Sequence, residues 1–141
     1  MSIEDFRGAT KRNKPELNEG DVIFCQVTRH YPRYEMPTEV SCIDADSVKQ
    51  WTTNECYFGQ LMDGVTFDVP ITYAVSLSRD KCYILKKCAS KLKFEIAVGL
   101  NGRVWVKGSN IQETLLVARF IKRSYGCSVA QIEALFTKLF S

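Results

Sequence analysis

Apolar residues in the middle of the chain, at positions 93–108, recur at every second position in two short runs. A period of two is typical of a half-buried β-strand. Glycine and asparagine adopt turn conformations at low cost, so the intervening segment 99–102 (GLNG) predicts the turn of a β-hairpin. The apolar residues of the two runs are Phe94, Ile96, Val98, Val104 and Val106.

A helical spacing replaces this alternation on the N-terminal side of the hairpin. Apolar residues recur every three or four positions over residues 71–78 and again over residues 85–92. Because this spacing places apolar side chains on one face of an α-helix, two consecutive helices are predicted. An alternating segment at 65–69 precedes them and predicts a strand.

Two further helices are predicted on the C-terminal side of the hairpin. Ser109 and Ser128 are each followed three residues later by a glutamine, which is the spacing of a capping box. Gly126 is expected to end the first of these helices. The second half of the chain therefore predicts the order β-α-α-β-β-α, followed by an extra C-terminal helix.

The first half of the chain shows weaker periodicity. A nearly continuous apolar run at 22–27 predicts a strand that is buried on both faces or lies inside a barrel. A second strand is expected over residues 36–44, where apolar and polar residues alternate. Residues 45–60 are expected to form an irregular connection.

The net charge of +3 conceals an uneven distribution along the chain. Residues 1–70 contain 7 Lys and Arg against 12 Asp and Glu, whereas residues 71–141 contain 12 against 4. A basic half favours a polyanionic partner such as a nucleic acid. The alternative is a solvated basic surface that has no partner.

Six cysteines raise the question of a disulfide framework or a metal site. The sequence has no CxxC pair, and its single histidine, His30, has no companion at a ligand spacing. We therefore expect reduced, structural thiols in a cytosolic or nuclear protein, with no metal and no cofactor. The cysteines are Cys25, Cys42, Cys56, Cys82, Cys88 and Cys127.

Neither an enzyme nor a membrane protein is predicted. The sequence lacks the P-loop, GxSxG and HExxH motifs, and its closest approach to an acidic cluster is Asp44 with Asp46, which is more typical of a turn. No apolar run approaches the roughly 20 residues that cross a bilayer. The N-terminus has no apolar signal core, so secretion is not expected.

Three blocks of sequence resemble the cap subunits of the RNA exosome, which carry an S1 domain followed by a KH domain. The blocks are GLNGRVWVK at 99–107, GATKRNKP at 8–15 with GDVI at 20–23, and Phe58-Gly59 with Leu61 and Asp63-Gly64. The resemblance implies an α+β fold, with the C-terminal part of an OB-type S1 barrel at residues 1–63 and a KH-type domain at 64–141. Polynucleotide phosphorylase carries both modules in the opposite order.

The resemblance implies a non-catalytic RNA-binding subunit with RNA and the exosome's RNase PH-like ring subunits as partners. Such a subunit would guide RNA to the ring channel for 3′-to-5′ processing and degradation by other subunits, in the nucleus, the nucleolus and the cytoplasm. Two alternatives stay open. The chain could only join ring subunits without binding RNA appreciably, or it could be an S1/KH protein that acts outside the exosome.

The sequence departs from common KH and S1 patterns in two places. Most KH domains clamp nucleic acid with a GxxG loop between their first two helices, and the junction at 78–81 (SRDK) has no such loop. The resemblance instead implies a structural role for Gly99, Asn101 and Gly102, packed against the S1 side. The S1 similarity starts at the tail of the third strand, so we expect an incomplete or open barrel.

Basic residues within two of these three blocks are the candidate RNA contacts. RNA guidance by such residues would depend on phosphate neutralisation. The candidates are Lys11, Arg12, Lys14, Arg103 and Lys107.

Overall fold

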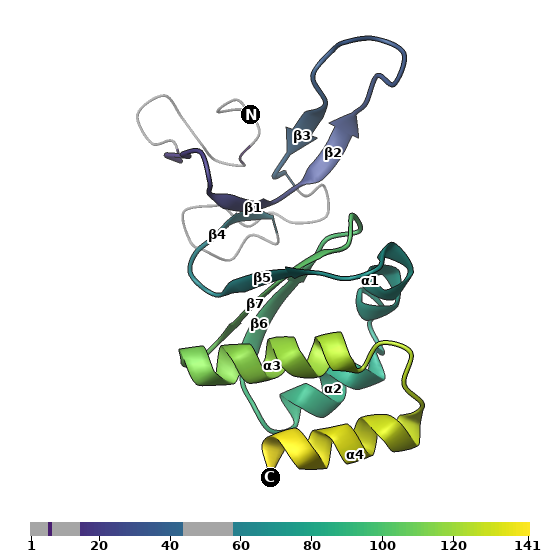
Figure 1. The fold of residues 1–141 in the computed structure, drawn as a ribbon. Coiled ribbons are helices and arrows are strands. Elements are labelled where there is room, and N and C mark those ends of the chain that lie inside the picture. The colour runs from purple at the N-terminus through teal and green to yellow at the C-terminus, as the bar shows by residue number, and fades with distance from the viewer. Residues whose placement is uncertain (1–5, 7–14, 44–57) are drawn as a thin grey trace. The chain divides into compact units, whose positions relative to one another are not determined.

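The computed structural model describes residue 6, residues 15–43 and residues 58–141. The chain divides into two compact units, Met1–Met62 and Asp63–Ser141. Figure 1 shows strands in both units and helices in the second.

A three-stranded antiparallel sheet is the frame of the second unit. Its strands are β5 (Val65–Asp68), β6 (Phe94–Val98) and β7 (Arg103–Gly108), and β7 lies between the other two. The predicted hairpin is confirmed, because β6 and β7 pair in register from Phe94 opposite Gly108 to Val98 opposite Val104.

Four helices complete this unit. α3 packs against β7 and β5, and α2 and α4 pack against α3 (Figure 1). The order β-α-α-β-β-α with an extra C-terminal helix is confirmed, and so is the α+β class. The helices are α1 (Ile71–Leu77), α2 (Tyr83–Ala89), α3 (Ile111–Arg123) and α4 (Val129–Phe140).

The hydrophobic core lies between the sheet and the helices. Val104 and Val106 of β7 are fully buried in it, as the alternating pattern predicts. The hydroxyl of Tyr73 donates a hydrogen bond to the carbonyl of Ile121 at 2.7 Å, so α1 is tied to α3 inside this core. Leu77, Cys88, Val117, Phe120, Ile132 and Phe136 complete the cluster of buried residues.

The two predicted capping boxes have different outcomes. At α4 the prediction is confirmed, because the Ser128 hydroxyl accepts from the Gln131 backbone while the Gln131 side chain accepts from the Ser128 backbone. At α3 the box from Ser109 is wrong by one residue. The Asn110 side chain caps the helix instead, accepting from the Glu113 backbone at 2.8 Å. Asparagine is one of the strongest N-cap residues, which accounts for the shift.

The boundaries of the second helix also differ from the prediction. α2 begins at Tyr83 and ends at Ala89, so Leu92 follows the helix, although it packs against the core. The apolar spacing therefore predicted which residues pack on the core, but not where the helical hydrogen bonds end. The backbone N–H of Ser90 donates to Lys86 and Lys87 carbonyls where the helix ends.

In the first unit, the described strands form two separate two-stranded sheets. β1 (Val22–Phe24) pairs with β4 (Gly59–Leu61), and β2 (Gln26–Arg29) pairs with β3 (Glu39–Ser41). The prediction of one buried strand over 22–27 is wrong, because the strand breaks at Cys25 and Val27 is 62% exposed. An apolar run predicts burial only if other elements cover both of its faces.

Two further predictions for the first unit need correction. Residues 59 and 60 belong to β4 and not to an irregular connection. The strand predicted over residues 36–44 is only three residues long, and Met36 is exposed. Asp44 and Asp46 lie outside the described residues.

Candidate nucleic-acid interface

Four residues, 99–102, connect β6 to β7 in the hairpin. The backbone N–H of Gly99 donates to the Arg103 carbonyl at 2.8 Å, and the N–H of Gly102 donates to the Gly99 carbonyl at 3.0 Å. Gly102 has φ +91°, the left-handed conformation that closes such connections. Asn101 does not share this conformation, and its side chain instead accepts from the Arg103 backbone at 3.1 Å.

Each glycine of this turn is required by a close contact. A Cβ atom on Gly99 would lie 2.5 Å from Oδ1 of Asn101, so a side chain there would displace the asparagine. A Cβ atom on Gly102 would lie 2.5 Å from the Val69 carbonyl oxygen. The backbone of Val69 also donates to the Gly102 carbonyl at 2.7 Å. The turn therefore holds the end of β5 and the start of α1, which favours a structural role; its packing against the S1 side stays a prediction.

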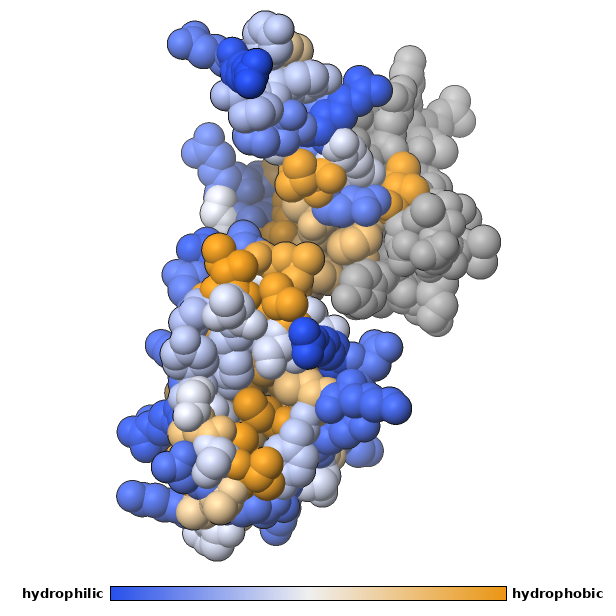
Figure 2. Space-filling model, turned by 90° about the vertical axis from the view of Figure 1, so that its right-hand side faces the viewer, coloured by the Kyte–Doolittle hydropathy of each residue, from blue (hydrophilic) through white to orange (hydrophobic). Residues whose placement is uncertain are grey.

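Apolar surface is exposed beside this turn. Figure 2 shows the side of the molecule on which α1 lies, with apolar surface set among hydrophilic residues. Leu100 at the turn and Ile71 on α1 are 63% and 61% exposed, and Val75 is 39% exposed. Exposed apolar groups of this kind are typical of contact surfaces.

The two basic candidates on β7 both lie beside acidic side chains. Nε of Arg103 is 3.1 Å from Oδ1 of Asp68, its cross-strand neighbour on β5. Nζ of Lys107 is 3.7 Å from Oδ2 of Asp63. Each carboxylate offsets part of the positive charge that would attract phosphate to Arg103 or Lys107. Lys11, Arg12 and Lys14 lie outside the described residues.

Trp105 lies between Arg103 and Lys107 on β7. A half-buried strand with Val104 and Val106 on its buried face would place Trp105 on the exposed face. The structure buries it to 5% exposure. Its indole Nε1 donates to the Asp63 carbonyl at 2.7 Å, and its ring approaches the backbone of Gly64, where a Cβ atom would lie 2.8 Å from Nε1. Asp63 and Gly64 both have positive φ. An Asp-Gly pair in a sequence indicates a turn, but not which side chain packs on it.

The junction between α1 and α2 also differs from a nucleic-acid clamp. Residues 78–82 connect the two helices, and the sequence there is SRDKC, without glycine. The backbone N–H of Cys82 donates to the Arg79 carbonyl at 3.1 Å within this loop. Arg79 and Lys81 are exposed but flank Asp80, so the loop has mixed charge.

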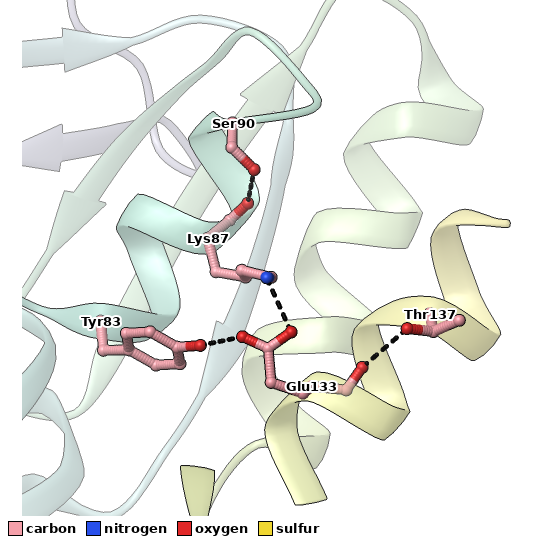
Figure 3. A network of polar contacts seen from close by, with 5 residues as sticks. All are labelled: Tyr83, Lys87, Ser90, Glu133 and Thr137. Atoms are coloured by element: carbon pink, nitrogen blue, oxygen red, sulfur yellow. Dashed lines mark hydrogen bonds and ion pairs between the residues drawn. The ribbon is translucent and has the colours of Figure 1, made fainter. Parts of the chain in front are cut away.

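A polar network joins α2 to the C-terminal helix, as Figure 3 shows. The Glu133 carboxylate on α4 accepts from the Tyr83 hydroxyl and lies 2.7 Å from Nζ of Lys87 on α2. The ammonium of Lys87 is also 5.0 Å from the ring centre of Phe136. The hydrogen bonds from Lys87 and Tyr83 lower the pKa of Glu133. The packing of α4 against α2 accounts for these contacts, so they do not indicate a ligand-binding site.

Cys25, Cys82, Cys88 and Cys127 are free thiols, and Cys56 lies outside the described residues. Cys42 and Cys88 are buried, and burial raises the pKa of the Cys88 thiol to about 12. No group of three or more metal-ligating side chains occurs among the residues the structure describes. No described helix is long and apolar enough to cross a membrane.

Family models match both halves of the chain. The model for the S1 domain of exosome complex component RRP40 matches residues 1–52, and a KH domain model matches residues 64–112. These matches place an S1 segment before a KH segment, in the order that the sequence predicts.

Individual relatives match most of this chain. Exosome complex component RRP40 of Saccharomyces cerevisiae is 34% identical over 86% of this chain and 48% of its own length. Its Homo sapiens counterpart is 32% identical over 99% of this chain and 48% of its own length. A Dictyostelium discoideum relative is 36% identical over 100% of this chain and 56% of its own length. The chain thus spans about half the length of the curated relatives it matches.

A solved structure named as an exosome complex RNA-binding protein has a similar fold. It superposes with a TM-score of 0.65 over 88% of this chain and 65% of its own length, at 16% identity. At this identity the similarity concerns the fold alone.

Proposed function

Because the chain belongs to the family of RRP40 exosome components, which it matches over S1 and KH segments, we propose that it is an RNA-binding cap subunit of the RNA exosome. The observation that supports this most is the RRP40 S1 match followed by the KH order β-α-α-β-β-α. We assign residues 1–63 to the S1 part and residues 64–141 to the KH part.

In this proposal the chain itself cleaves nothing. It guides RNA toward a ring of RNase PH-like subunits, where other subunits process and degrade it from 3′ to 5′. The basic excess of residues 71–141 supplies the attraction for phosphate, and the location follows that of the exosome in the nucleus, the nucleolus and the cytoplasm.

A second candidate is a scaffolding subunit that contacts the ring but binds RNA only weakly. Three observations favour it. The α1–α2 junction lacks the GxxG clamp, Arg103 and Lys107 have acidic neighbours, and Leu100 with Ile71 exposes apolar surface. Apolar exposure suits protein docking better than phosphate binding.

Co-purification separates these functions from one outside the exosome. The tagged full chain, expressed in cells, should recover exosome ring subunits. Recovery of ribosomal proteins in their place would indicate an S1/KH factor outside the exosome. Appreciable binding of single-stranded RNA by the purified chain would then distinguish the guiding subunit from the scaffold.

The proposed contribution of Lys11, Arg12 and Lys14 has its own test. Replacing all three with glutamate should weaken the binding of single-stranded RNA by the assembled cap, because like charges then repel phosphate. The melting temperature should stay near that of the parent protein. Unchanged RNA affinity at low salt would remove these three residues from the site.

A further inference from the structure

The C-terminal half of α3 carries a compact cluster of basic residues: Arg119, Lys122 and Arg123. All three side chains are exposed. Lys122 and Arg123 follow Arg119 by three and four residues, so the three side chains lie on one side of the helix. Among the described residues none of them has an acidic partner within ion-pair distance, in contrast to Lys87, Arg103 and Lys107.

Helix stability does not account for this arrangement. Like charges spaced by three or four residues repel each other and destabilise a helix. Lys122 and Arg123 lie in the last turn, where the helix dipole favours cations, but Arg119 lies before it. The nearest acidic residue on α3 is Glu113 in the first turn. The cluster therefore has an electrostatic cost that a bound anion would remove.

An exposed aromatic side chain follows the cluster. Tyr125 comes directly after the C-cap residue Ser124, and it is 53% exposed. One side of its ring packs against Tyr73, with ring centres 5.1 Å apart, which holds it in place. Proteins that bind single-stranded nucleic acids combine basic groups for the backbone with aromatic rings on which bases stack.

We propose that Arg119, Lys122 and Arg123 bind the phosphate backbone of single-stranded RNA and that Tyr125 stacks on a base of the same strand. The proposal rests on the proposed RNA-binding function and assigns it to a surface other than the turn and the α1–α2 junction. Guanidinium groups donate paired hydrogen bonds to phosphate oxygens, and the ammonium contributes a point charge. An exposed aromatic ring two residues after Arg123, in a cluster of cations with no acidic partner among the described residues, favours RNA over an acidic protein as the ligand.

The test measures binding of a labelled single-stranded oligouridylate to the full chain by fluorescence anisotropy at several salt concentrations. The variant R119Q/K122Q/R123Q should bind about tenfold more weakly at low salt. The slope of log affinity against log salt should become shallower by about 2, since each lost contact on a single strand contributes roughly 0.7. The variant Tyr125→Leu should lower affinity and leave this slope unchanged.

The matched control removes the same charge elsewhere in the same unit. K81Q/K86Q/K91Q replaces three exposed lysines, one in the α1–α2 junction, one in α2 and one just after α2, that have no ion pair among the described residues. Its affinity should fall much less than that of the α3 variant. Melting curves check folding, and Arg119→Gln alone, with a slope change of about 0.7, serves if the triple variant is unstable.

Three outcomes would overturn the proposal. If the parent chain binds RNA and both triple variants bind equally well, the α3 surface is not the site, while the proposed function stands. If the α3 variant binds RNA normally but no longer recovers exosome subunits, the cluster contacts a protein. If the parent chain binds no RNA, both the α3 site and the RNA-binding function are wrong.

Discussion

The β2–β3 hairpin and the β6–β7 hairpin are both antiparallel, but they differ in what surrounds them. All four residues of β2 are exposed, whereas Val104 and Val106 of β7 are fully buried. β7 has a strand on each side and α3 against it, while β2 pairs only with β3 among the described residues. An isolated two-stranded hairpin is marginally stable in water, so its stability depends on further strands or helices.

The connections of the two hairpins differ in the same sense. The β6–β7 connection is four residues long, 99–102, and Gly102 and Asn101 fix its conformation. The β2–β3 connection spans residues 30–38, and the register of the two strands shifts between Val27 and Arg29. A tight turn fixes the register of its two strands, whereas with a long loop the register depends on how the side chains pack. Tyr34 in this loop is 72% exposed.

Truncating one aromatic residue in each hairpin should give the largest contrast. Trp105→Ala should destabilise the second unit by about 3–5 kcal/mol, because it removes a buried indole and its hydrogen bond to Asp63. Tyr34→Ala should change stability by less than about 0.5 kcal/mol. Urea unfolding monitored by circular dichroism would measure both. Similar losses would show that the two hairpins do not differ in this way.

An added methyl group tests the turn and should have the next largest effect. Gly102→Ala should cost about 2–4 kcal/mol, since it combines a strained left-handed backbone with contact to the Val69 carbonyl. Gly126→Ala is the matched control, with φ +72° but no atom within 4 Å of the new Cβ, so it should cost about 1 kcal/mol. Equal melting temperatures for the two variants would contradict the proposed close packing of the turn.

RNA binding by these two variants should change only through folding. For Gly102→Ala, the affinity for single-stranded RNA should fall in proportion to the folded fraction. A variant that melts like the parent but has lost RNA binding would show that the turn contacts RNA directly.

The smallest expected effect is the pH dependence of the stabilisation that Glu133 of α4 provides. The folded-state pKa of Glu133 lies below its unfolded value near 4.5, because Lys87 and Tyr83 hydrogen-bond its charged form. Its contribution to stability is therefore present above about pH 4.5 and is lost as pH falls through the lowered folded-state pKa. The melting temperatures of the parent and of Glu133→Gln should differ at pH 7 and converge in acid. A difference that persists at pH 3 would contradict this assignment.

Lys87→Gln gives an independent check of the same network. It removes the partner that lies 2.7 Å from Glu133, so it should reproduce most of the pH dependence of Glu133→Gln. The β2–β3 hairpin contains an ion pair of its own, between Arg29 and Glu39 at 3.8 Å. Both of these side chains are highly exposed, so the loss of that pair should be close to neutral.

The sequence alone determined the elements whose signals are local. The strands at 94–98 and 103–107, the hairpin turn at GLNG and the Ser128–Gln131 capping box depend on residues a few positions apart, and each was confirmed. The basic spacing of Arg119, Lys122 and Arg123 was readable in the same way, but its significance depends on acidic side chains elsewhere. No local sequence pattern predicts which carboxylate will lie beside a given basic side chain.

The tertiary structure decided the features that depend on distant residues. Arg103 faces Asp68 and the indole of Trp105 reaches Asp63 only because β5 pairs with β7, which brings together residues 35 and 42 positions apart. The alternating pattern placed Trp105 in solvent because it cannot show that the second face of a strand is also covered. For the same reason the apolar run at 22–27 predicted a buried strand, although Val27 is exposed. Periodicity fixes which side chains share a face, and burial depends on what packs against that face.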